Sequence, residues 1–192
     1  MASVIIVEGH SEVESIPILF RRIHSEFEPK RYFSILQNNI IRIPRSTLMR
    51  EGEIERAVTA ASIRLDREGN ILVIIDADND EPIALEQMLN LKAKAAVPHL
   101  NVEVVVAVRE YESWIIYSIS SVVGRRGFAN EIVLPFNIEN ISGAKEWLSR
   151  HMIGKTYSET QDCPAISAIM DLALCKNSVS FKRFFDVVRS MD

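Results

Sequence analysis

The chain has 192 residues, of which 47% are apolar and 25% charged, and its formal net charge is −4 at pH 7. This length suits one well-buried domain, and the composition excludes an intrinsically disordered chain. The negative charge argues against a protein that holds nucleic acid by its phosphates alone, because such proteins are normally basic. Since the sequence shows neither an apolar run of membrane-spanning length nor a signal peptide, we expect a cytoplasmic protein with no membrane partner.

The first half of the chain shows strands that alternate with helices. Short runs rich in β-branched residues predict strands, and apolar residues at helical spacing predict helices. In chain order these elements are a strand over 4–7, a helix over 11–27, a strand over 32–36, an irregular basic segment over 41–47, a helix over 53–66 and a strand over 71–75.

The second half continues this alternation and then becomes helical. Pro82 opens a helix that reaches about residue 96, a strand is predicted over 102–108, and three helices are predicted after Gly143. The alternation predicts an α/β fold, a Rossmann-like parallel sheet of about four strands with helices on both faces. We expect residues 1–140 to form the core and residues 141–192 a C-terminal helical extension packed on it, within a single structural domain.

Acidic side chains follow the predicted strands. Glu8 follows the first, Asp76 and Asp78 follow the strand over 71–75, and Glu110 and Glu112 follow the strand over 102–108. The carboxyl ends of parallel strands meet at one edge of a sheet, where these carboxylates would repel one another without a cation. In extended geometry, residues two apart such as Asp76 and Asp78 point the same way. Oxygen ligands favour Mg²⁺ or Mn²⁺ over zinc. A solvated acidic turn remains the alternative.

Four motifs together resemble a known family. They are Val7-Glu8-Gly9-His10-Ser11-Glu12, Asp76-Ala77-Asp78, the segment 109–114 (Arg-Glu-Tyr-Glu-Ser-Trp) and the segment 155–160 (Lys-Thr-Tyr-Ser-Glu-Thr). Over nearly the whole chain, the sequence is similar to the Toprim-like family called domain of unknown function 4276. More distantly it resembles the Toprim domain of topoisomerases, bacterial primases and the overcoming-lysogenization-defect nucleases. The resemblance implies a Toprim version of the Rossmann-like fold.

The resemblance also implies roles for individual residues. Glu8 would act in general acid-base chemistry or bind metal, and a lysine downstream would be catalytic. Two Mg²⁺ or Mn²⁺ ions held by such carboxylates can stabilise both the entering and the leaving oxygen of a phosphodiester. The residues that match are Glu8, Glu12, Asp76 and Asp78 as metal ligands, Glu112 as a further candidate ligand, and Lys155 as the catalytic lysine.

Basic residues supply candidates for substrate binding. Arg42 and Arg45 lie in the irregular segment after the predicted second strand, close to the acidic edge, and we expect them to contact phosphates. The basic pairs Arg21-Arg22, Arg125-Arg126 and Lys182-Arg183 are typical of solvated helix faces. Tyr111 and Trp114 are expected to pack the strand over 102–108 onto a helix.

The function implied by the resemblance is a metal-dependent nuclease that cuts or nicks nucleic acid; the sequence does not distinguish DNA from RNA as the substrate, and we favour DNA. Proteins of this sort often act beside a separate AAA or ABC-type ATPase in phage defence, and the chain has no nucleotide-binding loop of its own. It could also form a homo-oligomer. A non-catalytic metal-binding sensor or regulatory subunit is the main alternative, and primase-like nucleotidyl transfer is a weaker one.

Overall fold

The centre of the fold is a parallel four-stranded sheet. The structure, a computed structural model, describes residues 2–27, 39–65 and 68–191. Neighbouring strands are all parallel, in the order β2-β1-β3-β4. This arrangement confirms the predicted α/β, Rossmann-like sheet. The strands are β1 (Ser3–Val7), β2 (Ile40–Arg42), β3 (Asn70–Asp76) and β4 (Asn101–Ala107).

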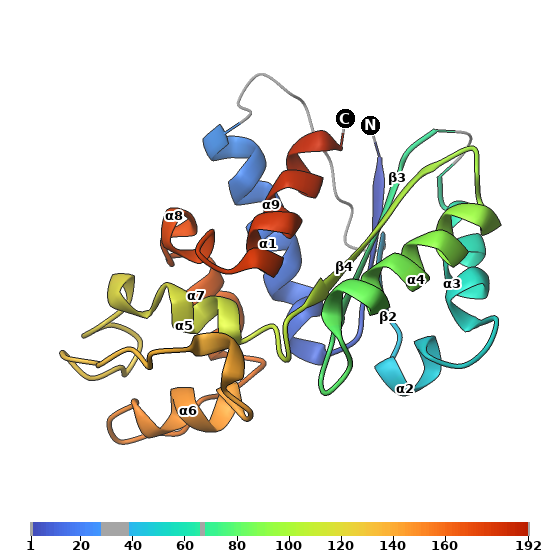
Figure 1. The fold of residues 1–192 in the computed structure, drawn as a ribbon. Helices are drawn as coiled ribbons and strands as arrows, with labels where there is room; N and C mark the ends of the chain where they lie inside the picture. The colour runs from blue at the N-terminus through green and yellow to red at the C-terminus, as the bar shows by residue number, and fades with distance from the viewer. Residues whose placement is uncertain (1, 28–38, 66–67, 192) are drawn as a thin grey trace.

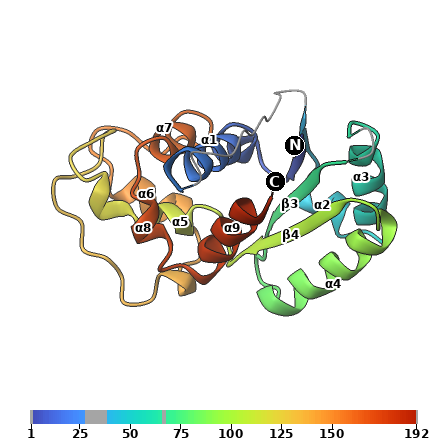
Figure 2. The ribbon, with the colours of Figure 1, turned by 90° about the horizontal axis from the view of Figure 1, so that it is seen from above.

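Helices cover both faces of the sheet (Figures 1 and 2). Side chains alternate along β1, so that Val4 and Ile6 belong to one apolar core while Ile5 and Val7 belong to the other. Burial on both faces explains why the central strands β1 and β3 are almost entirely apolar. The helices on the Val4 side include α3 (Glu53–Ser62) and α4 (Pro82–Ala96), and those on the Ile5 side include α1 (His10–Phe27) and α9 (Val179–Ser190).

The last third of the chain adds short helices to the Ile5 side. Trp114 is fully buried there, stacks on Phe184 and donates its indole N–H to Ser180 Oγ at 2.9 Å, which confirms its packing role. The same core contains sheet residues, so it continues across the predicted boundary at residue 140. Among the described residues, no helix combines the length and apolar character needed to cross a membrane. The added elements are α5 (Ser113–Tyr117), η2 (Ile119–Ser121), η3 (Ile138–Asn140), α6 (Ala144–Arg150), α7 (Asp162–Ser167) and α8 (Leu172–Cys175).

Some predicted elements differ from the structure. The strand predicted over 32–36 lies outside the described residues. The segment over 41–47 is not irregular: β2 pairs with β1 there, Ile43 donates its N–H to the Val7 carbonyl at 2.9 Å, and the short helix α2 (Arg45–Leu48) follows. After Gly143 the described chain forms four helices, α6 to α9, rather than three. Pairing with a neighbouring strand decided the conformation of β2, and local sequence does not encode it.

The outer edge of β4 is closed by side chains. Asn90 accepts a hydrogen bond from the Val104 N–H and donates one to the Val104 carbonyl, both at 2.9 Å. Glu86 accepts the Val106 N–H at 3.1 Å, and Arg183 of α9 holds Glu86 in place at 2.9 Å. These contacts pair the backbone groups of Val104 and the Val106 N–H, so the middle of this edge is not available to another strand.

Candidate metal centre

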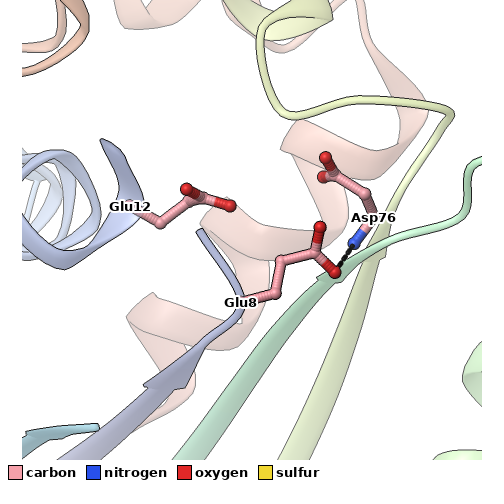
Figure 3. Close-up of side chains that lie close together, drawn as sticks. All are labelled: Glu8, Glu12 and Asp76. Carbon is pink, nitrogen blue, oxygen red and sulfur yellow. Dashed lines mark hydrogen bonds between the residues drawn. The ribbon is translucent and has the colours of Figure 1, made fainter. Parts of the chain in front are cut away.

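Three carboxylates converge at the carboxyl edge of the sheet (Figure 3). Glu8 follows β1 directly, Glu12 lies in the first turn of α1, and Asp76 is the last residue of β3. One oxygen from each lies within 4.8 Å of the others. Glu12 and Asp76 are buried, and Glu8 is partly buried. They meet because β1 and β3 are parallel neighbours that end at the same edge.

Hydrogen bonds orient all three carboxylates. The Asp76 N–H donates to Glu8 Oε2 at 3.2 Å, as the dashed line in Figure 3 shows. The Tyr111 N–H donates to Asp76 Oδ1 at 2.9 Å, and the Ser11 hydroxyl donates to Glu12 Oε2 at 2.6 Å. Each acid keeps at least one oxygen lone pair for another ligand, since a carboxylate has about four acceptor positions.

Gly9 makes room for the Glu12 carboxylate. A Cβ atom placed on Gly9 would overlap that carboxylate, whose carbon would lie only 2.9 Å away. The backbone of Gly9 is not among the positive-φ glycines, so close approach rather than conformation requires glycine here. The glycine that follows Glu8 is therefore explained by the lack of space for a side chain beside Glu12.

We expect Gly9→Ala to weaken Mn²⁺ binding at least about ten-fold, because the new methyl group displaces Glu12 from the cluster. Isothermal titration calorimetry measures the affinity. The thermal unfolding temperature in EDTA serves as the control and should match that of the wild type, since alanine is compatible with the backbone. Unchanged Mn²⁺ affinity would show that Glu12 is not a ligand.

Glu8 and Asp76 are destabilised as anions. Burial raises the pKa of Glu8 to about 7, and the charges of Glu12 and Asp78 add to this effect. Burial also raises the pKa of Asp76 well above its ordinary range, with further contributions from the charges of Glu8 and Glu112. A cation placed among these oxygens would remove the repulsion and favour the ionised forms.

A fourth carboxyl group and a lysine lie beside the cluster. Glu112 is only 1% exposed, and its Oε1 has no hydrogen-bond partner among the described residues. The Lys145 ammonium lies 3.9 Å from that oxygen and 3.1 Å from Glu159 Oε1. Burial raises the pKa of Glu112 to about 8 although Lys145 opposes the shift. Burial lowers the pKa of Lys145, but Glu112 and Glu159 outweigh this, so its net pKa lies above the ordinary value.

The segment 109–114 positions this lysine. Glu110 Oε1 accepts the Gly143 N–H at 2.9 Å and the Ala144 N–H at 3.4 Å, so it binds the start of α6. Lys145 is the next residue of that helix. The segment 109–114 therefore acts on the site in two ways. Its Tyr111 N–H holds the Asp76 carboxylate, and its Glu110 holds the helix that carries Lys145.

A family model described as Domain of unknown function (DUF4276) matches residues 7–189. The chain belongs to this family. Every carboxylate of the cluster, together with Glu112 and Lys145, lies within the match. The comparisons with curated proteins and with solved structures both find no match.

In this DUF4276 chain, Asp78 lies apart from the three-carboxylate cluster. It is exposed, its φ is 51°, and β3 ends two residues earlier. The prediction that Asp76 and Asp78 point the same way in extended geometry is therefore wrong, because Asp78 lies in a left-handed turn. Asp78 instead lies 3.5 Å from Arg45 and lines two pockets of about 390 and 240 Å³ with Asn79 and Arg109. Its role as a ligand stays a prediction.

The two predicted phosphate-binding arginines both contact backbone at this edge. Arg45 donates to the Asp76 carbonyl at 2.9 Å and the Ala77 carbonyl at 3.2 Å, and it also pairs with Asp80. These bonds hold the loop after β3. Arg42 is exposed and donates to the carbonyl of Glu8 at 3.3 Å. Arg42 thus keeps donors free toward solvent beside the cluster, while Arg45 is largely engaged by protein.

The structure places Lys155 differently from the prediction. Its ammonium pairs with the buried Asp162 at 2.5 Å, in the connection between α6 and α7. The catalytic role of Lys155 stays a prediction. In the part of the chain that the structure describes, Lys145 is the lysine that lies 3.9 Å from Glu112, beside the cluster. No local signal in the sequence identifies Lys145, because its position depends on Glu110 holding the start of α6.

The raised pKa values give the metal-free protein a defined pH dependence. Glu8, with a pKa of about 7, and Glu112, with one of about 8, keep their protons in the folded state well above the ordinary value of 4.5. The folded state therefore binds more protons than the unfolded chain between about pH 4.5 and 8, and the contribution of these groups to stability falls as pH rises through that range.

We expect the Mg²⁺-induced increase in unfolding temperature to grow from pH 5.5 to pH 8.5, since the cation binds the ionised carboxylates. Thermal unfolding with and without millimolar Mg²⁺ measures this. In the Glu8→Gln variant without metal, the unfolding temperature should fall less steeply as the pH rises. A Mg²⁺ effect that is constant across the range would contradict metal binding by these acids.

Proposed function

We propose that the chain is a metal-dependent nuclease that hydrolyses phosphodiester bonds of nucleic acid at the carboxylate cluster. The observation that carries this proposal is the convergence of Glu8, Glu12 and Asp76, with oxygens within 4.8 Å of one another, at the ligand-binding edge of a parallel sheet. A set of oxygen ligands suits Mg²⁺ or Mn²⁺. The Toprim resemblance of the same motifs points to the same chemistry.

The residues present fit a divalent cation. Three acids crowd one space, Gly9 leaves room for Glu12, and the buried Oε1 of Glu112 lacks a hydrogen-bond donor among the described residues. Glu8, Glu12 and Asp76 would hold one ion, and Glu112 is the candidate ligand of a second. Bound divalent ions would lower the pKa of an attacking water and stabilise charge on the reacting phosphate.

The protein's own groups supply the remaining functions. Glu8 is the candidate group that accepts a proton from water, as the alternative to direct metal ligation, because its carboxylate lies at the cluster beside Asp76. The Lys145 ammonium offsets the charge of Glu112 and can neutralise charge that develops on a phosphate oxygen. Arg42, exposed beside Glu8, would position a phosphate of the substrate.

Cleavage assays test the proposal. Supercoiled plasmid and a structured RNA are incubated with the purified protein in Mg²⁺, in Mn²⁺ and in EDTA. We expect nicking or cutting with metal, DNA being preferred, and none in EDTA. An AAA or ABC-type ATPase encoded nearby is the proposed partner, so each reaction is repeated with it and ATP. Intact nucleic acid in every reaction would contradict the proposal and leave a non-catalytic metal-binding module.

A further inference from the structure

Arg125 and Arg126 lie in a tight loop rather than on a helix face. Both are exposed, and neither guanidinium has a hydrogen-bond or ion-pair partner in the part of the chain that the structure describes. The basic pair on α9 differs, because Lys182 pairs with Asp186 at 2.8 Å and Arg183 pairs with two glutamates. The prediction of a solvated helix face is therefore wrong for Arg125-Arg126.

Backbone hydrogen bonds hold this loop in one conformation. Arg126 has a φ of 54°, which is uncommon for a residue with a side chain. The loop is closed on itself and is also joined to the chain after α6 through an isolated antiparallel bridge between Phe128 and Met152. Arginines on such a loop lose little backbone entropy when they bind a ligand. The closing bonds are Phe128 N–H to Arg125 O, Gly124 N–H to Ala129 O, Ala129 N–H to His151 O and Ile153 N–H to Gly127 O, at 2.7 to 3.0 Å.

Lys155 adds a third cation to the loop. A Cβ on Gly127 would lie 2.8 Å from Lys155 Cε, so the lysine stem packs directly against the loop backbone. Its ammonium pairs with Asp162, and 42% of the Lys155 side-chain surface is exposed. We name Arg125, Arg126 and Lys155 the basic loop cluster.

A chain of contacts links Lys155 of the basic loop cluster to the carboxylates. Glu159 contacts Lys145 at 3.1 Å, and Lys145 lies 3.9 Å from Glu112. Lys155 and Glu159 are four residues apart, so their backbones are separated by at most about 14 Å.

We infer that the basic loop cluster binds the phosphate backbone of a nucleic acid whose scissile bond lies at the carboxylate cluster. This inference rests on the proposed nuclease function. The carboxylates and the net charge of −4 repel phosphates, so affinity must come from cations outside the metal centre. Unpaired guanidiniums on a rigid loop are well suited to this, because arginine binds phosphate through two parallel hydrogen bonds.

Binding of a labelled DNA duplex tests the inference. All proteins carry Glu8→Gln to prevent cleavage, and the dissociation constant is measured in Mg²⁺ at several salt concentrations. We expect Arg125→Ala/Arg126→Ala to weaken binding about ten-fold or more and to lower the salt slope by about 1.8, since each lost phosphate contact lowers it by about 0.9. The control is Arg56→Ala/Lys182→Ala, which removes the same charge from exposed positions on α3 and α9 and should leave the slope unchanged.

The outcomes separate this inference from the function on which it rests. If the loop variant binds as tightly as the parent while the wild type still cleaves DNA, the inference is wrong and the nuclease proposal stands. Equal loss of affinity in the loop variant and the control would indicate general electrostatics and would also overturn the inference. A wild type that neither binds nor cleaves nucleic acid would overturn both.

Discussion

Glu8→Gln and Asp76→Asn are each expected to lower metal-dependent cleavage by about 10³-fold, or ~4 kcal/mol in activation free energy. Each change removes one anionic ligand from the cluster and keeps the shape of the side chain. The amide oxygens can still accept the hydrogen bonds that the Asp76 and Tyr111 N–H groups donate to these two side chains. Single-turnover cleavage of plasmid DNA in Mn²⁺ measures the effect.

The unfolding temperature of these variants without metal shows whether a lost activity reflects a damaged catalytic site or a misfolded protein. Both acids have pKa values raised by burial and by the charges of neighbouring carboxylates, so the neutral amides should leave the unfolding temperature in EDTA unchanged or higher at pH 8. Asp186→Asn, at an exposed acid on α9, is the matched control and should cleave like the wild type. Wild-type cleavage by both cluster variants would exclude this site as the catalytic centre.

The second large effect is expected at Lys145. Lys145→Met leaves the buried Glu112 without its cation and removes positive charge beside the carboxylates, and we expect the cleavage rate at saturating DNA to fall about 10²-fold. Lys145→Arg should recover part of the rate. The variants are compared by rate in Mn²⁺ and by unfolding temperature.

Lys155→Met is the matched comparison, because the sequence motif assigned the catalytic role to Lys155. This substitution leaves the buried Asp162 without its ion pair, so we expect it to lower the unfolding temperature while the rate at saturating DNA stays within a few-fold of the wild type. A larger loss of rate in Lys155→Met than in Lys145→Met, in folded protein, would return the catalytic role to Lys155.

Patterns within single elements allowed much of the fold to be predicted. The apolar runs of β1 and β3 are buried on both faces, and this environment favours β-branched and other apolar residues; β4 has the same pattern except at Asn101 and Glu103. The apolar spacing of α1 and the proline that opens α4 are local signals of the same kind. Glu8 and Asp76 could be predicted together because parallel strands deliver their last residues to one edge.

Other features depend on contacts between distant segments. Asp78 follows Asp76 by two residues, yet a left-handed turn, stabilised by an N–H bond to the Arg109 carbonyl at 3.0 Å, takes it out of the cluster. Arg45 shows no local sign of its role, which is to hold the loop after β3. The strand β2 forms because β1 offers it a partner.

The parallel sheet, the family and the acids at the ends of β1 and β3 follow from local sequence patterns, because strand periodicity and strand ends are encoded in neighbouring residues. The groups that surround these acids depend instead on contacts between distant segments. Lys145 reaches Glu112 because Glu110, thirty-five residues earlier in the chain, binds the start of α6. Such a contact depends on how helices pack against the sheet, and no spacing in the sequence reports it.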